Sequence, residues 1–181
     1  MSYDFITLNI AILWILILLL LALSFKRVGQ PLNASVPALK KLPVGQIAPD
    51  FSALALDGSS VNRSIYAERD VCFIFVQPHC ESCRAKIPTL NRLYAKARTH
   101  GVELVLVCIS DLESAKTMVS QLNIGFTVLA SNPGSTTLSI QFDPSLITPF
   151  FCLINKKSIV VSTGLVNSRD WNQLELLWES K

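Results

Sequence analysis

Two cysteines separated by two residues, Cys80 and Cys83, restrict the fold of this chain more than any other feature. The segment before them, Val71–Val76, is apolar and rich in β-forming residues, which predicts a buried strand. The segment after them, Arg84–Leu93, has the apolar spacing of a helix. A CxxC pair on a strand-to-helix turn is typical of a thiol–disulfide oxidoreductase, because the helix N-terminus stabilises a thiolate at the first cysteine.

The two cysteines are expected to have different roles. Cys80 lies at the exposed start of the predicted helix and is the predicted nucleophile, whereas Cys83 lies one turn further in and would resolve a mixed disulfide. The alternatives are an ordinary pair of cysteines or half of a zinc site. A zinc site needs two further ligands, and the chain has only two histidines, His79 and His100, and no second CxxC. We therefore expect neither a metal nor a cofactor.

Two charged or titratable residues flank the predicted nucleophile. A protonated His79 would favour the thiolate of Cys80 and Glu81 would disfavour it, so we expect the two residues to modulate the site in opposite directions. Pro88 lies inside the predicted helix, where a proline costs about 3 kcal/mol. A kink beyond the active-site turn would explain this proline, and a helix that starts later is the alternative.

A second candidate element is Thr148-Pro149, directly before an apolar segment. A cis peptide would be tolerated in this turn, and a proline beside a CxxC pair keeps a backbone edge open for an extended substrate. These two residues are therefore predicted to bind substrate. The alternative is a trans proline that simply begins a strand.

The remaining cysteines each fall inside a predicted apolar strand, at Cys72, Cys108 and Cys152. Buried cysteine behaves as a small hydrophobic residue, and we expect these three to be part of the core. Three unpaired cysteines are unusual in an oxidising compartment, so they are the best cysteine-based argument for a cytoplasmic domain.

The N-terminal region contains an uncharged run, Phe5–Phe25, whose 21 residues would extend about 30 Å as a helix, enough to cross a bilayer. A cleaved signal peptide would have a basic start and a shorter apolar core, so we predict a retained transmembrane helix. The predicted organisation is a tail over residues 1–4, a transmembrane helix over 5–25, a linker over 26–44 and one domain over 45–181.

The charge pattern bears on orientation and on partners. Lys26 and Arg27 follow the apolar run, which on the positive-inside rule alone favours a cytoplasmic domain. Membrane-tethered CxxC chemistry usually serves an oxidising exterior compartment, and we favour that side. The net charge of +3 is small, and the basic residues form no stripe with aromatic residues, so nucleic acid is not an expected partner.

The order of elements predicts an α/β fold, a mixed sheet flanked by helices. After the strand and helix around the CxxC pair, the pattern predicts a second buried strand over 102–109. A capping box formed by Ser110 and Glu113 is predicted to begin a helix that ends near Leu122. The remaining predictions are a strand over 126–130, a loop from 132, an antiparallel hairpin of 150–154 with 159–161, and a helix over 169–179 capped by Ser168, with Trp171, Leu174, Leu177 and Trp178 on its buried side.

Together, the CxxC pair, Pro88 and Thr148-Pro149 resemble the thioredoxin-like superfamily. The segment Val44–Phe51 is similar to the start of the domain in its redoxin and TlpA-like branch. Within that branch the chain most resembles the MauD family of methylamine utilisation proteins, on its Trp-containing apolar run, on the proline after the CxxC pair and on the stretch Gly164–Arg169.

This resemblance implies a thioredoxin-like fold behind an anchor in the bacterial inner membrane, with the domain in the periplasm. In the MauD family the protein helps to mature the disulfide-rich small subunit of methylamine dehydrogenase. The resemblance makes Cys80 the attacking thiol, Cys83 the resolving thiol and Pro149 the cis-proline of the substrate groove. It also implies a membrane electron-transfer partner similar to DsbD or CcdA.

The chain departs from ordinary thioredoxins around the site. His79 replaces the usual tryptophan, Glu81 and Ser82 replace Gly-Pro, and Ile74 replaces a buried carboxylate that assists proton transfer. A role other than bulk reductase is therefore favoured. A peroxiredoxin is disfavoured, because its pattern requires proline and threonine where this chain has Phe73 and Gln77.

Other functions remain open on the sequence. A TlpA-like thiol reductase for cytochrome c or copper-site assembly shares all of these features. A non-catalytic thioredoxin-fold binding module or chaperone would use the CxxC pair as a structural disulfide. A metal chaperone would bind Cu(I) through the reduced thiols.

Overall fold

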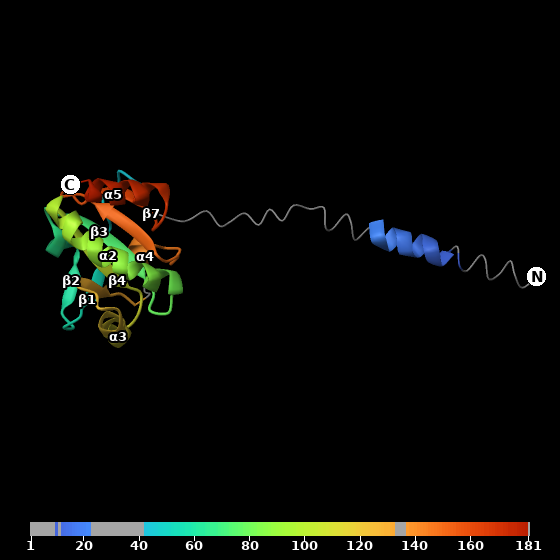
Figure 1. Cartoon of the computed structure of the whole chain (residues 1–181), viewed down its shortest axis with the longest axis horizontal. Coiled ribbons are helices and arrows are strands. Elements are labelled where there is room, and N and C mark those ends of the chain that lie inside the picture. The colour runs from blue at the N-terminus through green and yellow to red at the C-terminus, as the bar shows by residue number, and fades with distance from the viewer. Residues whose placement is uncertain (1–9, 11, 23–41, 133–136, 181) are drawn as a thin grey trace, which may run out of the picture. The chain divides into compact units, whose positions relative to one another are not determined.

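The computed structural model describes residues 10, 12–22, 42–132 and 137–180. It divides the chain into two units, residues 1–38 and 39–181, of which the second holds the sheet (Figure 1). In the first unit, residues 12–22 are helical and their side chains are exposed. None of the helices among the described residues is long and apolar enough to cross a membrane. The tail 1–4, most of the linker 26–44 with Lys26 and Arg27, and both ends of the span 5–25 lie outside the described residues, so the membrane anchor stays a prediction.

The second unit contains a seven-stranded sheet in the order β2-β1-β5-β4-β3-β6-β7. Its strands are β1 (Ser52–Ala55), β2 (Ser60–Asn62), β3 (Asp70–Val76), β4 (Val102–Cys108), β5 (Val128–Ala130), β6 (Phe150–Ile154) and β7 (Val160–Leu165). The helices are η1 (Arg63–Tyr66), α2 (Glu81–Thr99), α3 (Leu112–Leu122), α4 (Leu138–Phe142) and α5 (Arg169–Glu179). Strands β3, β4 and β5 are parallel, and the other pairings are antiparallel.

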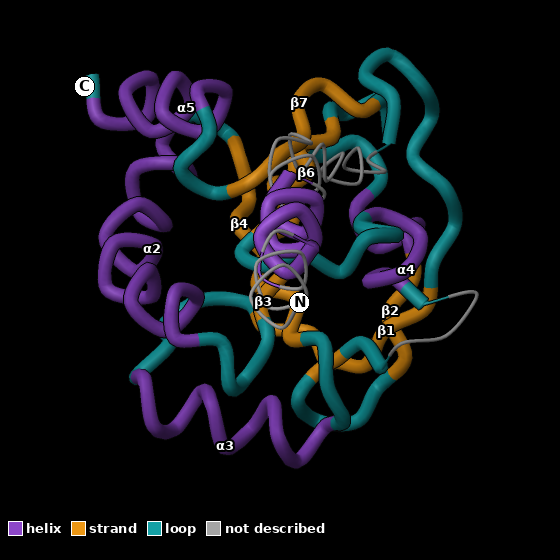
Figure 2. Tube along the Cα trace, turned by 90° about the vertical axis from the view of Figure 1, so that its right-hand side faces the viewer, coloured by secondary structure: helices purple, strands orange, loops and turns teal. Residues whose placement is uncertain are grey.

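The sheet is covered by helices on both faces, which confirms the predicted α/β fold of a mixed sheet flanked by helices. Helices α2, α3 and α5 contribute to a core on one face, and α4 and η1 to a core on the other. Figure 2 shows α2 and α5 on one side of the strands and α4 on the opposite side. Strand β3, inside the sheet, leads directly into the turn that begins α2. The CxxC pair therefore lies just beyond the end of an interior strand.

Strand β3 is buried on both faces, which explains its continuous apolar run. Alternate side chains enter opposite cores: Cys72 and Ile74 lie in the core under α2, and Phe73 and Phe75 in the core under α4. Phe73 makes edge-on ring contacts with Phe142 of α4, with ring centroids 5.5 Å apart. The predicted buried strand is confirmed, and it anchors the N-terminus of α2 rigidly.

Several element boundaries differ from those predicted. Asp111, and not Ser110, caps α3, because its carboxylate accepts the backbone N–H of Ser114 at 2.7 Å. The short helix α4 was not predicted, since its five residues are too few for a helical period to show. On α5 the cap at Ser168 is confirmed, but Leu177 is 56% exposed and does not belong to the buried side.

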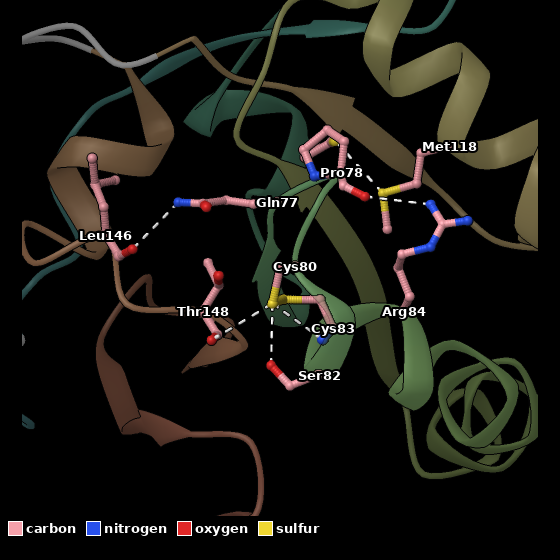
Figure 3. The surroundings of a disulfide bond; sticks show 10 residues. Gln77, Pro78, Cys80, Ser82, Cys83, Arg84, Met118, Leu146 and Thr148 are labelled. Carbon is pink, nitrogen blue, oxygen red and sulfur yellow. Dashed lines mark hydrogen bonds between the residues drawn. A yellow bond between two sulfur atoms is a disulfide. The ribbon is translucent and has the colours of Figure 1, made fainter.

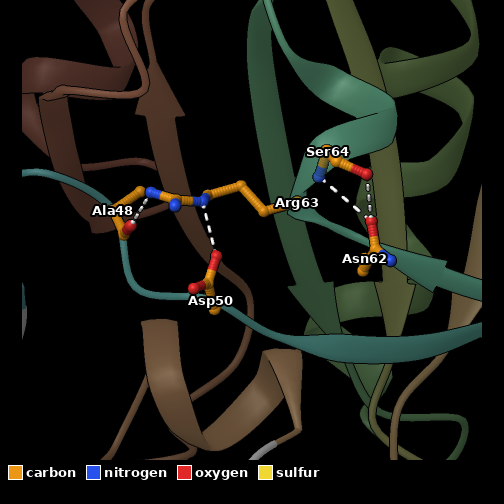
Figure 4. Close-up of polar contacts among 5 residues, drawn as sticks. All are labelled: Ala48, Asp50, Asn62, Arg63 and Ser64. Atoms are coloured by element: carbon orange, nitrogen blue, oxygen red, sulfur yellow. Dashed lines mark hydrogen bonds and ion pairs between the residues drawn. The ribbon is translucent and has the colours of Figure 1, made fainter.

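The N-terminal segment of the domain is tied to η1 by a single side chain. Arg63 donates from Nη1 to the carbonyl of Ala48 at 2.7 Å and pairs through Nε with Asp50 at 2.8 Å (Figure 4). Beside it, the Asn62 side chain accepts the backbone N–H of Ser64 and so caps η1. Arg63 therefore joins the segment before β1 to the strand pair β1–β2.

Candidate active site

Cys80 and Cys83 lie at the N-terminus of α2 and form a disulfide bond (Figure 3). Cys80 is the N-cap residue, with extended backbone angles of φ −78° and ψ 108°, and its Sγ accepts the backbone N–H of Cys83 at 3.2 Å. Cys80 is partly exposed, whereas Cys83 is fully buried in the core under α2. A reagent from solvent therefore reaches the first sulfur and not the second.

The surroundings of Cys80 favour a negative charge on its sulfur once the disulfide is reduced. The N-terminus of a helix of 19 residues carries a partial positive charge, and the amide of Cys83 already points at Sγ. The hydroxyl oxygen of Ser82 lies 3.2 Å from the same sulfur. Both groups can donate to a thiolate, which lowers the pKa of a thiol.

The Thr148–Pro149 peptide bond is cis, and the fold brings it to the CxxC pair. The Thr148 carbonyl oxygen lies 3.9 Å from Cys80 Sγ, and the side chain of Gln77 donates to the carbonyl of Leu146 at 3.5 Å. Figure 3 shows Gln77 and Cys80 facing this loop from the turn after β3. Among the described residues, the backbone of Thr148 pairs with no other backbone group, while that of Pro149 accepts the N–H of Val166 at 2.9 Å.

The two flanking residues, His79 and Glu81, are exposed. Among the described residues, no side-chain hydrogen bond or ion pair involves either His79 or Glu81. Glu81 lies in the first turn of α2, where a negative charge interacts favourably with the helix dipole and competes with a thiolate for it. Their predicted modulating role stays a prediction.

A residue that the sequence pattern did not single out, Arg84, joins the active-site turn to α3. Its guanidinium donates to the carbonyl of Pro78 at 3.3 Å and to Gln121 Oε1 at 3.3 and 3.4 Å. The groove between the turn and α3 has a volume of about 280 Å³, and its lining includes His79 and Met118. No local pattern could reveal that Arg84 links the turn to α3, because its contact with Gln121 depends on how α3 packs.

The structure also places Pro88 and Ile74, the first a feature shared with thioredoxins and the second a departure from them. Pro88 lies within α2, at an exposed position, so the alternative of a later helix start is wrong. Ile74 is fully buried and belongs to the same core cluster as Cys83. An isoleucine side chain cannot exchange a proton, so this position offers no general base to the buried thiol.

The three remaining cysteines are buried and unpaired, as predicted. Burial raises the pKa of the Cys72 thiol well above its ordinary value, and it raises that of Cys152 to about 12. The pKa of Cys108 is also raised by burial, partly offset by a contact with the Ser110 hydroxyl. Thiols of this kind are unreactive, so the redox chemistry is confined to the CxxC pair. No cluster of His, Cys, Asp and Glu within the described ranges could hold a metal ion.

Comparison with protein families identifies one match, to the family described as Redoxin, over residues 43–175. Among characterised proteins, the chain is similar to the thiol-disulfide oxidoreductase ResA of Bacillus cereus, with 29% identity over 75% of this chain and 77% of that protein. The protein of the same name from Bacillus anthracis is 28% identical over the same shares of the two chains.

Solved structures show the same fold. A protein from Chlorobium tepidum, provisionally named thiol:disulfide interchange protein DsbE, is 25% identical, with a TM-score of 0.62 over 76% of this chain and 98% of that one. The thioredoxin domain of a thiol-disulfide oxidoreductase from Bacteroides vulgatus superposes with a TM-score of 0.63 at 19% identity, over 76% of this chain and 99% of the other. At that identity the second likeness concerns the fold alone.

Proposed function

The chain belongs to the Redoxin family and is a thiol–disulfide oxidoreductase, and from this premise we propose that it is tethered to a membrane and exchanges disulfides with exported proteins. The observation that carries the proposal is the asymmetry of the CxxC pair. Cys80 is accessible at a helix N-terminus, Cys83 is buried behind it, and the Thr148–Pro149 turn lies against Cys80. This arrangement suits attack on a disulfide in an extended chain.

In the reducing direction, the Cys80 thiolate attacks one sulfur of the client disulfide. The client S–S bond breaks, a Cys80–client disulfide forms, and the departing client thiolate takes up a proton. The Cys83 thiol then loses its proton, attacks Cys80 Sγ and releases the second client thiolate. The client gains two electrons and the enzyme is left with the Cys80–Cys83 disulfide. The oxidising direction is the same sequence reversed.

The second step depends on deprotonating a buried thiol. Because Ile74 cannot accept the proton of Cys83, this step is expected to be slow compared with that of an enzyme with a carboxylate at that position. A slow second step lengthens the lifetime of the mixed disulfide between Cys80 and the client. That suits an enzyme with a dedicated client better than a general reductase.

The client is held, on this proposal, by backbone pairing at Thr148. Its N–H and C=O groups are free to pair with an extended segment, since no other described backbone group occupies them. Strand-like pairing gives affinity without demanding a particular side chain. The adjoining cis-proline, Pro149, shapes the turn that presents this edge to Cys80.

For the identity of the client, we propose the disulfide-rich small subunit of an amine dehydrogenase. Support comes from the MauD-like features: the Trp-containing apolar run, the proline after the CxxC pair and the stretch Gly164–Arg169. A second candidate is a TlpA-like thiol reductase for cytochrome c or copper-site assembly. The specific observation in its favour is that the matched relatives carry the name thiol-disulfide oxidoreductase ResA.

We further propose that the uncharged run Phe5–Phe25 anchors the domain on the outer side of the bacterial inner membrane, where a DsbD- or CcdA-like protein exchanges electrons with it. A reporter fused after Lys181 that is active only outside the cytoplasm tests the orientation. Activity supports the periplasmic proposal, and an inactive but stable fusion overturns it together with the proposed client.

The direct test of function is to trap the client. In the Cys83→Ala variant of the full chain, Cys80 should retain its client as a mixed disulfide, which migrates as a larger species on a non-reducing gel and is identified by mass spectrometry. The matched control carries Cys80→Ala as well and should trap nothing. Failure of the single variant to trap any protein, with the variant folded and present, would argue for a non-catalytic binding module.

A further inference from the structure

The groove beside the active-site turn contains a positive charge that the proposed reaction does not use. This groove has a volume of about 280 Å³, and it is lined by Pro78 and His79 of the turn, by Arg84 of α2 and by residues of α3. Its volume is below the usual range of small-molecule sites and suits one or two side chains of a protein client. Because Pro78 and His79 directly precede Cys80, the groove lies next to the nucleophile.

The positive charge belongs to Arg84. Of the arginines that the structure describes, Arg84 is the one that is not exposed and yet forms no ion pair with a carboxylate. The acidic residue that lines the groove, Glu113, is 81% exposed and pairs with Lys116 at 2.9 Å. A half-buried cation without a counter-charge has lost part of its hydration and has gained no Coulomb attraction in return.

Two neutral acceptors hold the Arg84 guanidinium in position. It donates from Nη1 to the Pro78 carbonyl at 3.3 Å (Figure 3), and Gln121 Oε1 accepts from Nη1 and Nη2 at 3.4 and 3.3 Å. These contacts occupy N–H groups but leave the positive charge unbalanced. A guanidinium that is already fixed loses little side-chain entropy when it binds an anion.

Arg84 and the substrate turn lie on different sides of the nucleophile. The Thr148 carbonyl oxygen is 3.9 Å from Cys80 Sγ, and Figure 3 shows Thr148 on one side of Cys80 and Arg84 on the other. The backbone N–H of Arg84 donates to the Cys80 carbonyl at 3.0 Å, so the two residues are one helical turn apart. An extended client advances by about 3.3 Å with each residue, so a side chain about two to four residues from the client cysteine can reach the groove.

We propose that Arg84 determines client specificity: its guanidinium binds the carboxylate of a glutamate or aspartate that lies within about four residues of the client cysteine. The planar guanidinium presents N–H groups in a fork that matches the two oxygens of a carboxylate. The preferred substrates are therefore disulfides with an acidic residue close to one of their cysteines. This inference rests on the proposed exchange with protein clients and names one feature by which a client is selected.

The test uses the full chain, purified in detergent and reduced, with two series of synthetic peptides that each contain one disulfide. One series has glutamate at a single position within about four residues of a cysteine, and the other has glutamine at the same position. The second-order rate constant of disulfide exchange is measured for each peptide. At the favoured position the glutamate peptide should react about fivefold faster than its glutamine counterpart, the effect of about one partly exposed ion pair. Equal rates at every position would overturn the inference.

Substitutions on α2 show whether Arg84 is the source of this preference. In Arg84→Gln the glutamate-to-glutamine ratio should fall to about one, and because both peptides react with the same protein, any effect of the change on the active-site turn cancels. Arg84→Lys keeps the charge without the planar fork and should retain part of the preference. A preference that persists in full in Arg84→Gln would overturn the inference.

The matched control is Lys86→Gln, which removes one positive charge from the same helix. Lys86 is not one of the described residues that line the groove, and residues two apart on a helix face different directions. This variant should keep the full preference for glutamate. An equal loss in Arg84→Gln and Lys86→Gln would mean that net charge alone sets the ratio, and would overturn the inference.

Failure of this inference can be told apart from failure of the proposed function. If the unmodified protein exchanges with none of the peptides, the proposed function is contradicted and the inference falls with it. If it exchanges with both series at equal rates, only the inference is contradicted. If Arg84→Gln does not fold, the salt dependence of the unmodified protein decides. The ratio should decline toward one as NaCl is raised from about 0.02 to about 0.5 M, because salt screens an ion pair, and a ratio that does not change would overturn the inference.

Discussion

Replacing Asp143 with asparagine should stabilise the domain, and by an amount that depends on pH. The pKa of this carboxyl is raised by burial from an ordinary value of 3.8 to about 7. The folded state therefore binds a proton that the unfolded state has released, and the stability of the unmodified protein falls as pH rises between these values. Each pKa unit corresponds to about 1.4 kcal/mol, so the full cost above pH 7 is about 4 kcal/mol. Between pH 5 and pH 8 the cost grows by about 3 kcal/mol.

Asparagine has the same shape but no charge, so Asp143→Asn escapes this cost. Urea unfolding at pH 5 and at pH 8, followed by the fluorescence of the buried Trp171 and Trp178, gives the free energy of unfolding of both proteins. All other groups titrate alike in the two proteins and cancel in the comparison. The variant should gain about 3 kcal/mol relative to the unmodified protein between the two pH values. The reasoning would be refuted if the two proteins differed in unfolding free energy by the same amount at pH 5 and pH 8. It would also be refuted if the stability of the variant fell relative to the unmodified protein at pH 8.

Three further predictions concern the thiols and the core. Ser82→Ala should move the pH profile of Cys80 alkylation by iodoacetamide to higher pH, because a hydroxyl 3.2 Å from the sulfur is lost, and Ser82→Thr should largely restore the profile. In the reduced native protein, N-ethylmaleimide should rapidly label Cys80 and not the buried thiols, and mass spectrometry that finds rapid labelling of Cys72, Cys108 or Cys152 would contradict their burial. Trp171→Ala should lower the unfolding free energy by about 3–5 kcal/mol, since this side chain is 1% exposed and packs edge-on against Phe151, with ring centroids 5.3 Å apart. Urea denaturation measures the loss, and a value below about 1 kcal/mol would show that α5 contributes little to the core.

Much of the fold could be predicted because its signals are local. The continuous apolar run of β3, the CxxC pair before α2 and the serine cap of α5 each depend on residues close together in the chain. A strand buried on both faces must be apolar throughout, and a helix must satisfy its first amides, so both leave a pattern in the sequence. The predicted positions of these elements agree with the structure to within a few residues.

Two predictions were wrong where neighbouring residues fit the same local pattern: the cap at Ser110 and the burial of Leu177. Ser110 and Asp111 are both good caps, and Asp111 caps α3 because its carboxylate reaches the Ser114 amide, whereas the Ser110 hydroxyl is engaged with the Asp111 carbonyl at 3.0 Å. Leu177 fits the apolar spacing of α5, yet it points to solvent, because the width of the buried stripe depends on what the helix packs against.

The sequence by itself determined the chemistry: two cysteines at a strand-to-helix turn, with a proline-containing turn far along the chain. Only the tertiary structure decided how these parts meet, because the antiparallel pairing of β3 with β6 is what brings Thr148 to within 3.9 Å of Cys80. Tertiary packing also buries Cys83 and brings Gln121 of α3 to Arg84. Hydrogen bonds and burial between distant segments leave no periodic signal in a single sequence, and these contacts distinguish this site from other CxxC turns.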